Sequence, residues 1–373
     1  MSERKPTDKP LKRGWTTGAC ATAATKASLT ALLTGKFPDP VSISLPKGET
    51  PSFPLCRERL AHDHAMSSII KDAGDDPDVT HGAEICVKVS RGEPGFGVLF
   101  KAGEGVGTVT KAGLPIPPGE PAINPVPRQL MEAEVESLCR AFDEPMDITI
   151  EVSIVNGAEL AERTWNPRLG IVGGLSVLGT TGVVHPFSCS AWIHSIHRGV
   201  DVARAAGLQH IAGSTGSTSE DVVQKLYNLP DIALMDMGDF AGGLLKYVRS
   251  HPVPHLTIAG GFAKLTKLAQ GALDLHSARS QVDFDWLANR LETLGGSDGL
   301  CERVKTANTT AEVLSLAKEE NEGLVVSLAH AVALNAKKTA NTTLAKGGAD
   351  AVVSVSILVV ARDGRVLASS AGD

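Results

Sequence analysis

Residues 210–261 read HIAGSTGSTSEDVVQKLYNLPDIALMDMGDFAGGLLKYVRSHPVPHLTIAGG. Three short apolar runs in this stretch predict strands, at 210–212, 232–236 and 255–259. Helices are expected between them, at 219–227 and 240–249. This alternation is typical of βαβ units with a parallel sheet, in which ligands bind beyond the carboxyl ends of the strands. We therefore expect a ligand site along the turns that follow the three strands, at Gly213, Thr215, Gly216, Gly238, Asp239, Gly260 and Gly261.

Predicted helices and strands continue on both sides of this stretch. Helices are expected before and after it, at 189–206 and 262–276. Residues 284–346 have mostly helical character, and residues 351–368 predict two strands joined by a turn at Asp363-Gly364. Residues 166–373 are therefore predicted to form a Rossmann-like domain: an open, mostly parallel, three-layer α/β domain with C-terminal helices and a hairpin.

The first half of the chain has a different pattern. Helices are expected at 18–34 and 125–142, because the first is rich in Ala and Leu and the second opens with proline. Short alternating or β-branched runs predict strands at 41–45, 67–71, 84–89 and 147–155. Residues 14–165 are therefore predicted to form an N-terminal α+β domain, and the polar residues 1–13 a loose tail.

Composition excludes several classes of protein. The net charge is −6 and only 4% of the residues are aromatic, which argues against a nucleic-acid partner. No apolar run approaches the ~18 residues of a membrane span, and no apolar leader follows the N-terminus, so we expect a cytoplasmic protein without membrane contact. The six cysteines are scattered, without zinc spacing, so no protein-bound metal is expected. A homo-oligomer is left open.

An acidic stretch, KDAGDDPDVTHG, occupies residues 71–82. Four aspartates and one histidine can bind a hard cation, although the spacing is not that of an EF-hand loop. An aspartate-rich turn that bonds to its own backbone is an alternative. A third interpretation is a ligand site, in which Asp75 or Asp78 accepts hydrogen bonds from amino or ring N–H groups.

Two further stretches are dense in proline or glycine. GEPAINPVPR at 119–128 has three prolines that stiffen the backbone, which can hold Glu120 and Asn124 in fixed positions or merely lead into the next helix. NPRLGIVGGLSVLGTTG at 166–182 has five glycines, which suit either close approach to a ligand or a tightly packed crossover. In contrast, Gly-Glu-Gly-Val-Gly at 103–107 is not a dinucleotide fingerprint, because no helix is expected after it.

Basic residues follow the last glycine turn of the predicted parallel sheet. Lys264 and Lys267 in KLTKL share one helix face just after Gly260-Gly261. Ammonium groups near the free N–H groups of a helix N-terminus favour an anion site. A solvated surface pair is the alternative.

These segments together resemble the CbiD family of cobalt-precorrin-5B C(1)-methyltransferases. The resemblance is collinear and extends from residue 13 to about residue 276. The matching segments are RGWTTGACA at 13–21, KDAGDDPDVTHG at 71–82, GVGTVTKAGLPIPPGEPAINPVPR at 105–128, NPRLGIVGGLSVLGTTG at 166–182, MGDF at 237–240 and KLTKLAQG at 264–271.

The resemblance implies an activity. It implies methyl transfer from S-adenosylmethionine to C-1 of cobalt-precorrin-5B, giving cobalt-precorrin-6A in cobalamin biosynthesis. The protein's main contribution to such an in-line displacement is to hold the reacting atoms in line. Any cobalt arrives inside the substrate.

Roles follow for the residues singled out above. A carboxylate near the sulfonium, or one that acts as a base, is an addition to the alignment of the reacting atoms, and the candidates are Asp75, Asp78, Glu120 and Asp239. The glycine turns of the parallel sheet are the expected donor site. Cations and neutral polar groups are expected to bind the polycarboxylate substrate, at Thr16, Thr17, Lys71, Lys111, Asn124, Arg128, Arg168, Thr180, Thr181, Lys264 and Lys267.

Three alternatives stay open at this point. The same fold can methylate C-1 of the metal-free precorrin of an aerobic pathway. The Gly213–Ser219 turn also suits a nucleotide- or phosphate-binding α/β protein without methyl transfer. A carrier of corrinoid intermediates would bind the tetrapyrrole but not the methyl donor.

Overall fold

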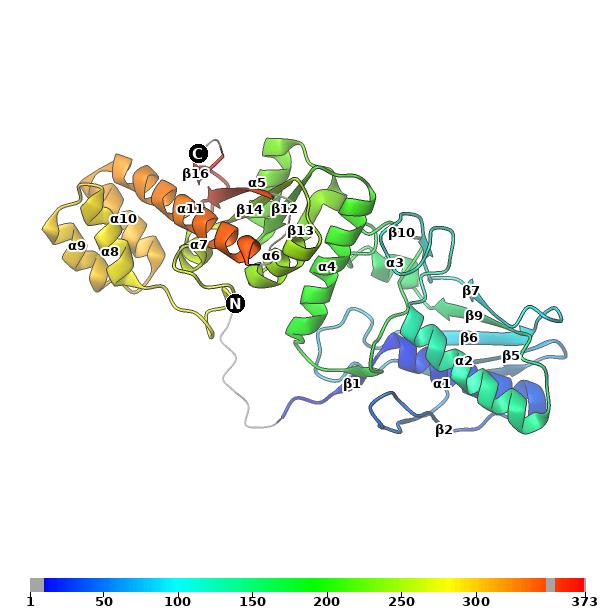
Figure 1. Cartoon of the computed structure of the whole chain (residues 1–373). Helices are drawn as coiled ribbons and strands as arrows, with labels where there is room; N and C mark the ends of the chain where they lie inside the picture. Colours follow the sequence, from blue (N-terminus) through cyan, green and yellow to red (C-terminus); the bar gives the residue numbers. More distant parts are fainter. Residues whose placement is uncertain (1–9, 347–352, 372–373) are drawn as a thin grey trace. The chain divides into compact units, whose positions relative to one another are not determined.

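The computed structural model describes residues 10–346 and 353–371 (Figure 1). The chain has a mixed α/β fold and divides into two compact units, Met1–Cys189 (unit 1) and Ser190–Asp373 (unit 2). This division differs from the boundary expected after residue 165. The reason is that 166–189 pairs with unit 1: β10 (Ile171–Val172) pairs with β8 (Thr108–Val109), and β11 (Val183–Val184) pairs with β1 (Gly14–Trp15).

Unit 1 contains a five-stranded sheet of order β4-β5-β6-β9-β7. Its pairs are antiparallel except that β7 runs parallel to β9. The strands are β4 (Arg57–Leu60), β5 (His64–Ile70), β6 (Glu84–Arg91), β7 (Val98–Ala102) and β9 (Ile148–Ile154). Every second residue of β9 is buried, and α1 packs on β5 and β6. The sheet therefore has one face in the core of unit 1.

Two long helices of unit 1 pack against each other, α1 (Thr17–Thr34) and α2 (Pro125–Phe142). Thr16 caps α1, and Gly35 ends it with φ at 80°. Both helices were predicted within a residue of their observed bounds. The expected strand at 41–45 is shorter, since β2 (Val41–Ser42) pairs only with β3 (Ser52–Phe53). Strand β7 was not expected, and the short α3 spans Gly157–Ala161.

Unit 2 contains a second five-stranded sheet, of order β13-β12-β14-β15-β16. Its first four strands are parallel, and β16 is antiparallel to β15. The strands are β12 (His210–Ser214), β13 (Leu234–Asp236), β14 (His255–Gly261), β15 (Ser354–Val360) and β16 (Val366–Ser369). The connecting helices are α4 (Cys189–Ala205), α5 (Ser217–Tyr227), α6 (Ala241–Ser250) and α7 (Phe262–Ala269), with a 3-10 turn at Asp231–Ala233. The predicted βαβ units and mostly parallel sheet are confirmed.

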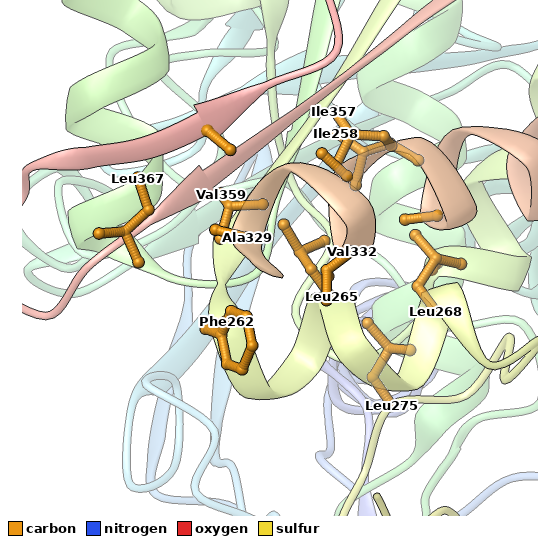
Figure 2. Packing of buried hydrophobic residues seen from close by; sticks show 14 of the residues in the cluster. Ile258, Phe262, Leu265, Leu268, Leu275, Ala329, Val332, Ile357, Val359 and Leu367 are labelled. Atoms are coloured by element: carbon orange, nitrogen blue, oxygen red, sulfur yellow. The ribbon is translucent and has the colours of Figure 1, made fainter. Parts of the chain in front are cut away.

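Both faces of this sheet are buried. Ile357 and Val359 of β15 belong to one core cluster, and Leu358 and Val360 to another. Figure 2 shows the first cluster, where Ile357 and Val359 lie near α7 and α11. The second cluster includes Val223 of α5. This alternation explains why residues 357–360 of β15 are all apolar, as expected for a strand covered on both faces.

The remaining helices of unit 2 are α8 (Phe284–Thr293), α9 (Asp298–Lys305), α10 (Thr310–Glu320) and α11 (Glu322–Ala345), of which α11 packs on α7 and β15. The helix expected at 262–276 is wrong in its length. It ends at Ala269, and Gly271 follows with φ at 95°, a conformation that does not continue a right-handed helix. The hairpin at the end of the chain is confirmed, although residues 351–352 of the expected first strand lie outside the described residues.

Candidate functional site

The turns after β12, β13 and β14 meet at the carboxyl end of the sheet of unit 2, here called the rim. Ser214 is in register with both Asp236 and Ala259. The Ser214 carbonyl accepts from the backbone N–H groups of Met237, at 2.9 Å, and Gly238, at 3.1 Å. The N–H of Thr215 donates to the carbonyl of Ala259 at 3.0 Å. The structure therefore brings together the three turns that the sequence singles out.

The glycines of the rim differ in what surrounds them. A Cβ on Gly213 would lie 2.2 Å from Leu244, so this glycine serves core packing. A Cβ on Gly260 would lie 2.7 Å from Thr215 Oγ1. Gly216 and Gly261 have no heavy atom within 4 Å of such a Cβ, and Gly238 has φ at 55°. Open space at the rim therefore lies beside Gly216 and Gly261.

Two buried oxygen atoms of the rim have no hydrogen-bond partner among the described residues. They are Ser214 Oγ, on a residue only 1% exposed, and Asp239 Oδ1. Lys264 Nζ forms an ion pair with Asp239 Oδ1 at 3.1 Å and donates a hydrogen bond to the Thr215 carbonyl at 2.9 Å. Buried polar atoms are almost always paired, so the unpaired Ser214 Oγ calls for an explanation such as a ligand.

The two lysines of KLTKL are already engaged. Lys267 lies in the last turn of α7, and its Nζ donates to the Leu275 carbonyl at 2.9 Å. Burial lowers the pKa of the Lys267 ammonium, against the opposing effect of Asp239. Lys264 is shared between Asp239 and the Thr215 carbonyl. The geometry therefore supports a role of both lysines in holding the rim together, beside the substrate role expected of them.

In unit 1, the acidic stretch surrounds a buried lysine. Lys71 is 2% exposed, and its Nζ donates to Asp78 Oδ2 at 2.5 Å, Thr80 Oγ1 at 2.5 Å and Thr17 Oγ1 at 3.2 Å. Asp78 Oδ1 accepts from the N–H and the hydroxyl of Thr80. All three N–H bonds of Lys71 are thus used inside unit 1. We call Lys71, Asp78, Thr80 and Thr17 the lysine cluster.

Charge pairing holds the Asp78 carboxylate in its ionised form. Burial acts to raise the pKa of Asp78, but the charge of Lys71 and the hydrogen bonds from Lys71 and Thr80 outweigh it and lower that pKa. The ionised form is therefore the stable one inside the lysine cluster. A group held in this way is poorly suited to accept a proton during a reaction.

The other aspartates of the stretch anchor the chain around it. Asp72 bonds to Lys12 Nζ at 2.6 Å, and Asp75 accepts from the backbone N–H of Lys12 at 2.6 Å. The hydrogen bond from Lys12 is the main cause that lowers the pKa of Asp72. Lys12 therefore does not belong to a loose tail, as was expected of residues 1–13; residues 1–9 lie outside the described residues.

The threonine pairs at 16–17 and 180–181 lie around the N-terminus of α1. Thr16 Oγ1 accepts from the N–H of Ala19 at 3.1 Å, which is a helix cap. The close approach of Gly179 leaves no room for a side chain, since a Cβ would lie 2.2 Å from Thr16 Oγ1. Thr181 Oγ1 bonds to its own turn at Val183, whereas Thr180 is exposed.

The proline-rich segment encloses Arg128. Its guanidinium donates to the carbonyls of Ile123, at 2.9 Å, and Pro121, at 3.1 Å, and to Glu120 Oε2 at 3.2 Å. It also lies over the Phe100 ring, 5.2 Å from the centroid. Arg128 and Glu120 therefore stabilise the turn before α2.

Two other cations expected to bind substrate lie near each other in unit 1. Thr110 bonds to the carbonyl of Gly170, and a Cβ on Gly170 would touch the Lys111 side chain, at 2.5 Å from Cγ. Arg168 precedes Gly170 by two residues, and its guanidinium lies over the Trp165 ring, 5.5 Å from the centroid. Among the described residues, neither the Lys111 ammonium nor the Asn124 side-chain amide has a hydrogen-bond or ion-pair partner. Lys111 is thus the cation best placed to take an external anion.

Sequence reasoning did not single out Ser214 and Thr80. Ser214 ends β12 between two residues that were named, so its position was the available signal. Thr80 stands two residues after Asp78, a spacing at which an aspartate often accepts from the following backbone. Within 10–346 and 353–371, no group of three or more His, Cys, Asp or Glu residues is placed to hold a metal ion, and no helix is long and apolar enough to cross a membrane.

Comparison with known proteins assigns the family. The CbiD family model matches residues 4–186, and the model of the CbiD C-terminal domain matches residues 274–371. The chain is 60% identical over 367 residues to a protein of Brucella abortus (strain S19) named cobalt-precorrin-5B C(1)-methyltransferase, and 98% of each chain is covered. It is 61% identical over 371 residues to the protein of that name from Brucella anthropi, covering 98% of this chain and 99% of the relative.

A solved structure of lower similarity is also matched. This crystal structure, of cobalamin biosynthesis protein (cbiD) from Archaeoglobus fulgidus, is 26% identical, with a TM-score of 0.39 and coverage of 72% of this chain and 83% of that one. The first family model covers the motifs of unit 1, whereas the rim is covered only by the curated relatives, since residues 213–261 lie between the two family models. The chain therefore belongs to the CbiD family, whose curated relatives carry the name cobalt-precorrin-5B C(1)-methyltransferase.

Proposed function

We propose that this chain, a cobalt-precorrin-5B C(1)-methyltransferase of cobalamin biosynthesis, takes its methyl group from S-adenosylmethionine bound at the rim of unit 2. The observation that carries the location is the buried Ser214 Oγ, which has no hydrogen-bond partner among the described residues, at the same rim as Asp239, whose Oδ1 is paired with Lys264. When bound, the donor supplies a methyl group that the sulfonium already activates. The rim also follows the general rule for ligands of open α/β sheets.

The residues of the rim fit such a donor. The Asp239 carboxylate is paired with Lys264 at 3.1 Å and remains 23% exposed, so its exposed part can attract a cationic group of the donor. Ser214 Oγ can donate to or accept from the polar groups of the ribose or the amino acid. Gly216 and Gly261 leave space for a ligand to approach the backbone. The role of these groups is to hold the donor in a fixed orientation, which is the largest contribution a protein makes to an in-line displacement.

For the substrate, the geometry favours Lys111 over the other expected cations. Corrin precursors carry carboxylate arms, which ammonium and guanidinium groups bind by charge-assisted hydrogen bonds. Lys71 uses its three N–H donors inside unit 1, and Arg128 uses its Nε and Nη2 groups there. Lys111 has no such partner among the described residues, so we assign it to a carboxylate arm, with Asn124 as a neutral donor to the same substrate.

A direct experiment tests the activity. The protein is incubated with cobalt-precorrin-5B and methyl-labelled S-adenosylmethionine, and the product is examined by mass spectrometry. One labelled methyl group per macrocycle is expected. A parallel incubation with the metal-free precorrin separates the two substrates. Absence of label from both products would reject methyl transfer.

The donor site is tested by binding of S-adenosylhomocysteine. Asp239→Asn and Ser214→Ala should each weaken binding in calorimetry, Asp239→Asn by at least tenfold, which corresponds to about 1.4 kcal/mol. Ser356→Ala is the matched control, because Ser356 is a buried serine near the amino end of β15 in the same sheet. Wild-type affinity in both rim variants would exclude this location for the donor.

A further inference from the structure

A tryptophan of unit 2 lies beside the rim and is held in place while it remains largely exposed. Trp192 of α4 is 45% exposed. Its Nε1 donates to the carbonyl of Asp236, the last residue of β13, at 2.9 Å. An indole whose N–H is hydrogen-bonded, but whose apolar surface stays largely exposed to solvent, is typical of a binding surface.

The neighbours of Trp192 support the ring from one side. Phe240 lies with its ring centroid 6.4 Å from that of Trp192, at an interplanar angle of 51°. The Arg279 guanidinium lies over Phe240, 5.9 Å from the centroid. Phe240 thus contributes an aromatic neighbour whose own position is supported by Arg279.

The other neighbour of the ring is Gly238. A Cβ on Gly238 would lie 3.5 Å from Trp192 Cζ2, so any larger side chain there would cover part of the indole. Gly238 has φ at 55°, and its N–H donates to the carbonyl of Ser214, which carries one of the unpaired oxygens. One backbone hydrogen bond therefore joins Gly238, which leaves the indole uncovered, to Ser214, whose side-chain oxygen has no partner among the described residues.

We propose that Trp192 is a stacking surface for a planar, conjugated ring of the ligand bound at the rim. The proposal rests on the proposed function and names a residue for which no role was expected. Two ligands of the reaction carry such a ring system: the adenine of the methyl donor and the conjugated part of the macrocycle. Stacking of a base on an aromatic side chain typically contributes enough to change affinity by about tenfold.

The test uses the full-length protein and two substitutions. Trp192→Leu removes the aromatic surface, and Trp192→Phe keeps a ring but removes the indole fluorophore. Trp286→Phe is the control, since Trp286 is another of the four tryptophans and packs on the core of unit 2. Calorimetry gives the Kd for S-adenosylhomocysteine and for cobalt-precorrin-5B, and circular dichroism checks the fold of each variant.

The expected result is a Kd about tenfold weaker for one of the two ligands in Trp192→Leu, and a Kd within threefold of wild type in Trp192→Phe and Trp286→Phe. Weaker S-adenosylhomocysteine binding assigns the ring to adenine, and weaker precorrin binding assigns it to the macrocycle. If adenine stacks there, S-adenosylhomocysteine also changes the emission of the wild type, and Trp192→Phe loses most of that change.

Unchanged Kd values for both ligands in Trp192→Leu would overturn the stacking role and leave the proposed function intact. A wild-type protein that binds neither ligand would overturn both. If Trp192→Leu does not fold, the decision falls on Trp192→Phe: loss of the emission change at unchanged Kd supports the proposal. An emission change of wild-type size in Trp192→Phe, with both Kd values at wild type, rejects it.

Discussion

The lysine cluster of unit 1 and the rim of unit 2 contain the same kinds of residue in opposite hydrogen-bonding states. Each joins lysine and aspartate to a hydroxyl. In the lysine cluster, Lys71 uses all three of its N–H bonds and Asp78 uses both carboxylate oxygens. At the rim, Ser214 Oγ has no hydrogen-bond partner among the described residues, and Asp239 Oδ1 is paired with Lys264 at 3.1 Å.

This difference separates a structural role from a binding role. A buried polar group that is fully paired stabilises the fold, and its loss leaves a partner unpaired. One that is unpaired costs free energy of folding until a ligand supplies the missing partner. Acidic composition alone left 71–82 open to three interpretations: a cation site, a structural turn and a ligand site. Hydrogen-bond accounting now favours the rim.

The sharpest test of this contrast is Lys71→Met. We expect the free energy of unfolding of unit 1 to fall by about 3 kcal/mol, because the Asp78 carboxylate would lose its buried partner. Affinity for S-adenosylhomocysteine should stay within twofold of wild type. Urea unfolding and calorimetry measure the two quantities.

Lys88→Met is the control for this experiment. Lys88 pairs with Glu151 at 2.9 Å on the surface of the same sheet, where the two side chains are 42% and 30% exposed. Its loss should cost less than about 1 kcal/mol. If Lys71→Met unfolds like the wild type but loses turnover, the lysine cluster binds substrate and the contrast fails.

A smaller effect is expected from replacing Lys111, which has no partner among the described residues, than from replacing Lys71. Arg128, which is hydrogen-bonded within unit 1, serves as the comparison. Lys111→Gln should raise the KM for cobalt-precorrin-5B five- to tenfold, at most about 1.4 kcal/mol, with little change in kcat and melting temperature. Arg128→Gln should mainly lower the melting temperature, since Arg128 holds two carbonyls and Glu120. Steady-state kinetics and thermal melts decide between them. The reverse pattern would contradict the assignment of Lys111 to a carboxylate arm.

The smallest expected effect concerns acid stability, which should differ between the units. In unit 2, burial and then the neighbouring His255 lower the pKa of His210 from 6.5 to about 4. Below pH 6.5 the unfolded chain therefore gains a proton that the folded unit does not bind, so stability falls as the pH drops from 6.5 to 4. In unit 1, the lowered pKa of Asp78 gives a loss of stability only below its ordinary value of 3.8.

The pH effect can be isolated with His210→Asn. Between pH 7 and pH 4.5, the Tm of unit 2 should fall by roughly 2–4 °C less in this variant than in the wild type, about 1 kcal/mol after allowance for solvent screening. His62→Asn, which removes an exposed imidazole of unit 1, is the control for loss of a histidine. Equal pH dependence in wild type and His210→Asn would exclude this histidine as the cause.

Local patterns predicted much of the fold. The helix Pro125–Phe142 was predicted at its observed bounds, because proline marks its start and apolar residues such as Leu130, Val135 and Leu138 recur at helical spacing. The βαβ order of unit 2 followed from the alternation of short apolar runs with helical stretches. Strand β7 escaped prediction, since only its middle residue, Phe100, is buried and its apolar run is short. The membership of 166–189 in unit 1 depends on pairing with residues far away in sequence.

The candidate site was less predictable than the fold. Sequence placed Thr215, Gly238 and Gly260 along one edge, and register in the sheet brings their turns together. The sequence alone could not show that all three N–H bonds of Lys71 are used, because one acceptor, Thr17, lies 54 residues away. The unpaired state of Ser214 Oγ is likewise a property of packing. Residue type indicates which groups bind polar ligands, and only the structure shows which of them are still available.

The order of strands in unit 2 has a consequence for synthesis of the protein. β15 lies between β14 and β16 in the sheet, yet the chain makes α7 to α11 before it returns from Gly261 to Ser354. On the ribosome, unit 1 has all its strands once Val184 has been translated. The sheet of unit 2 stays open at β14 until β15 and β16 emerge, so its apolar edge remains uncovered until then. A ribosome that stalls before residue 354 therefore leaves a finished first unit attached to a second one that lacks an interior strand.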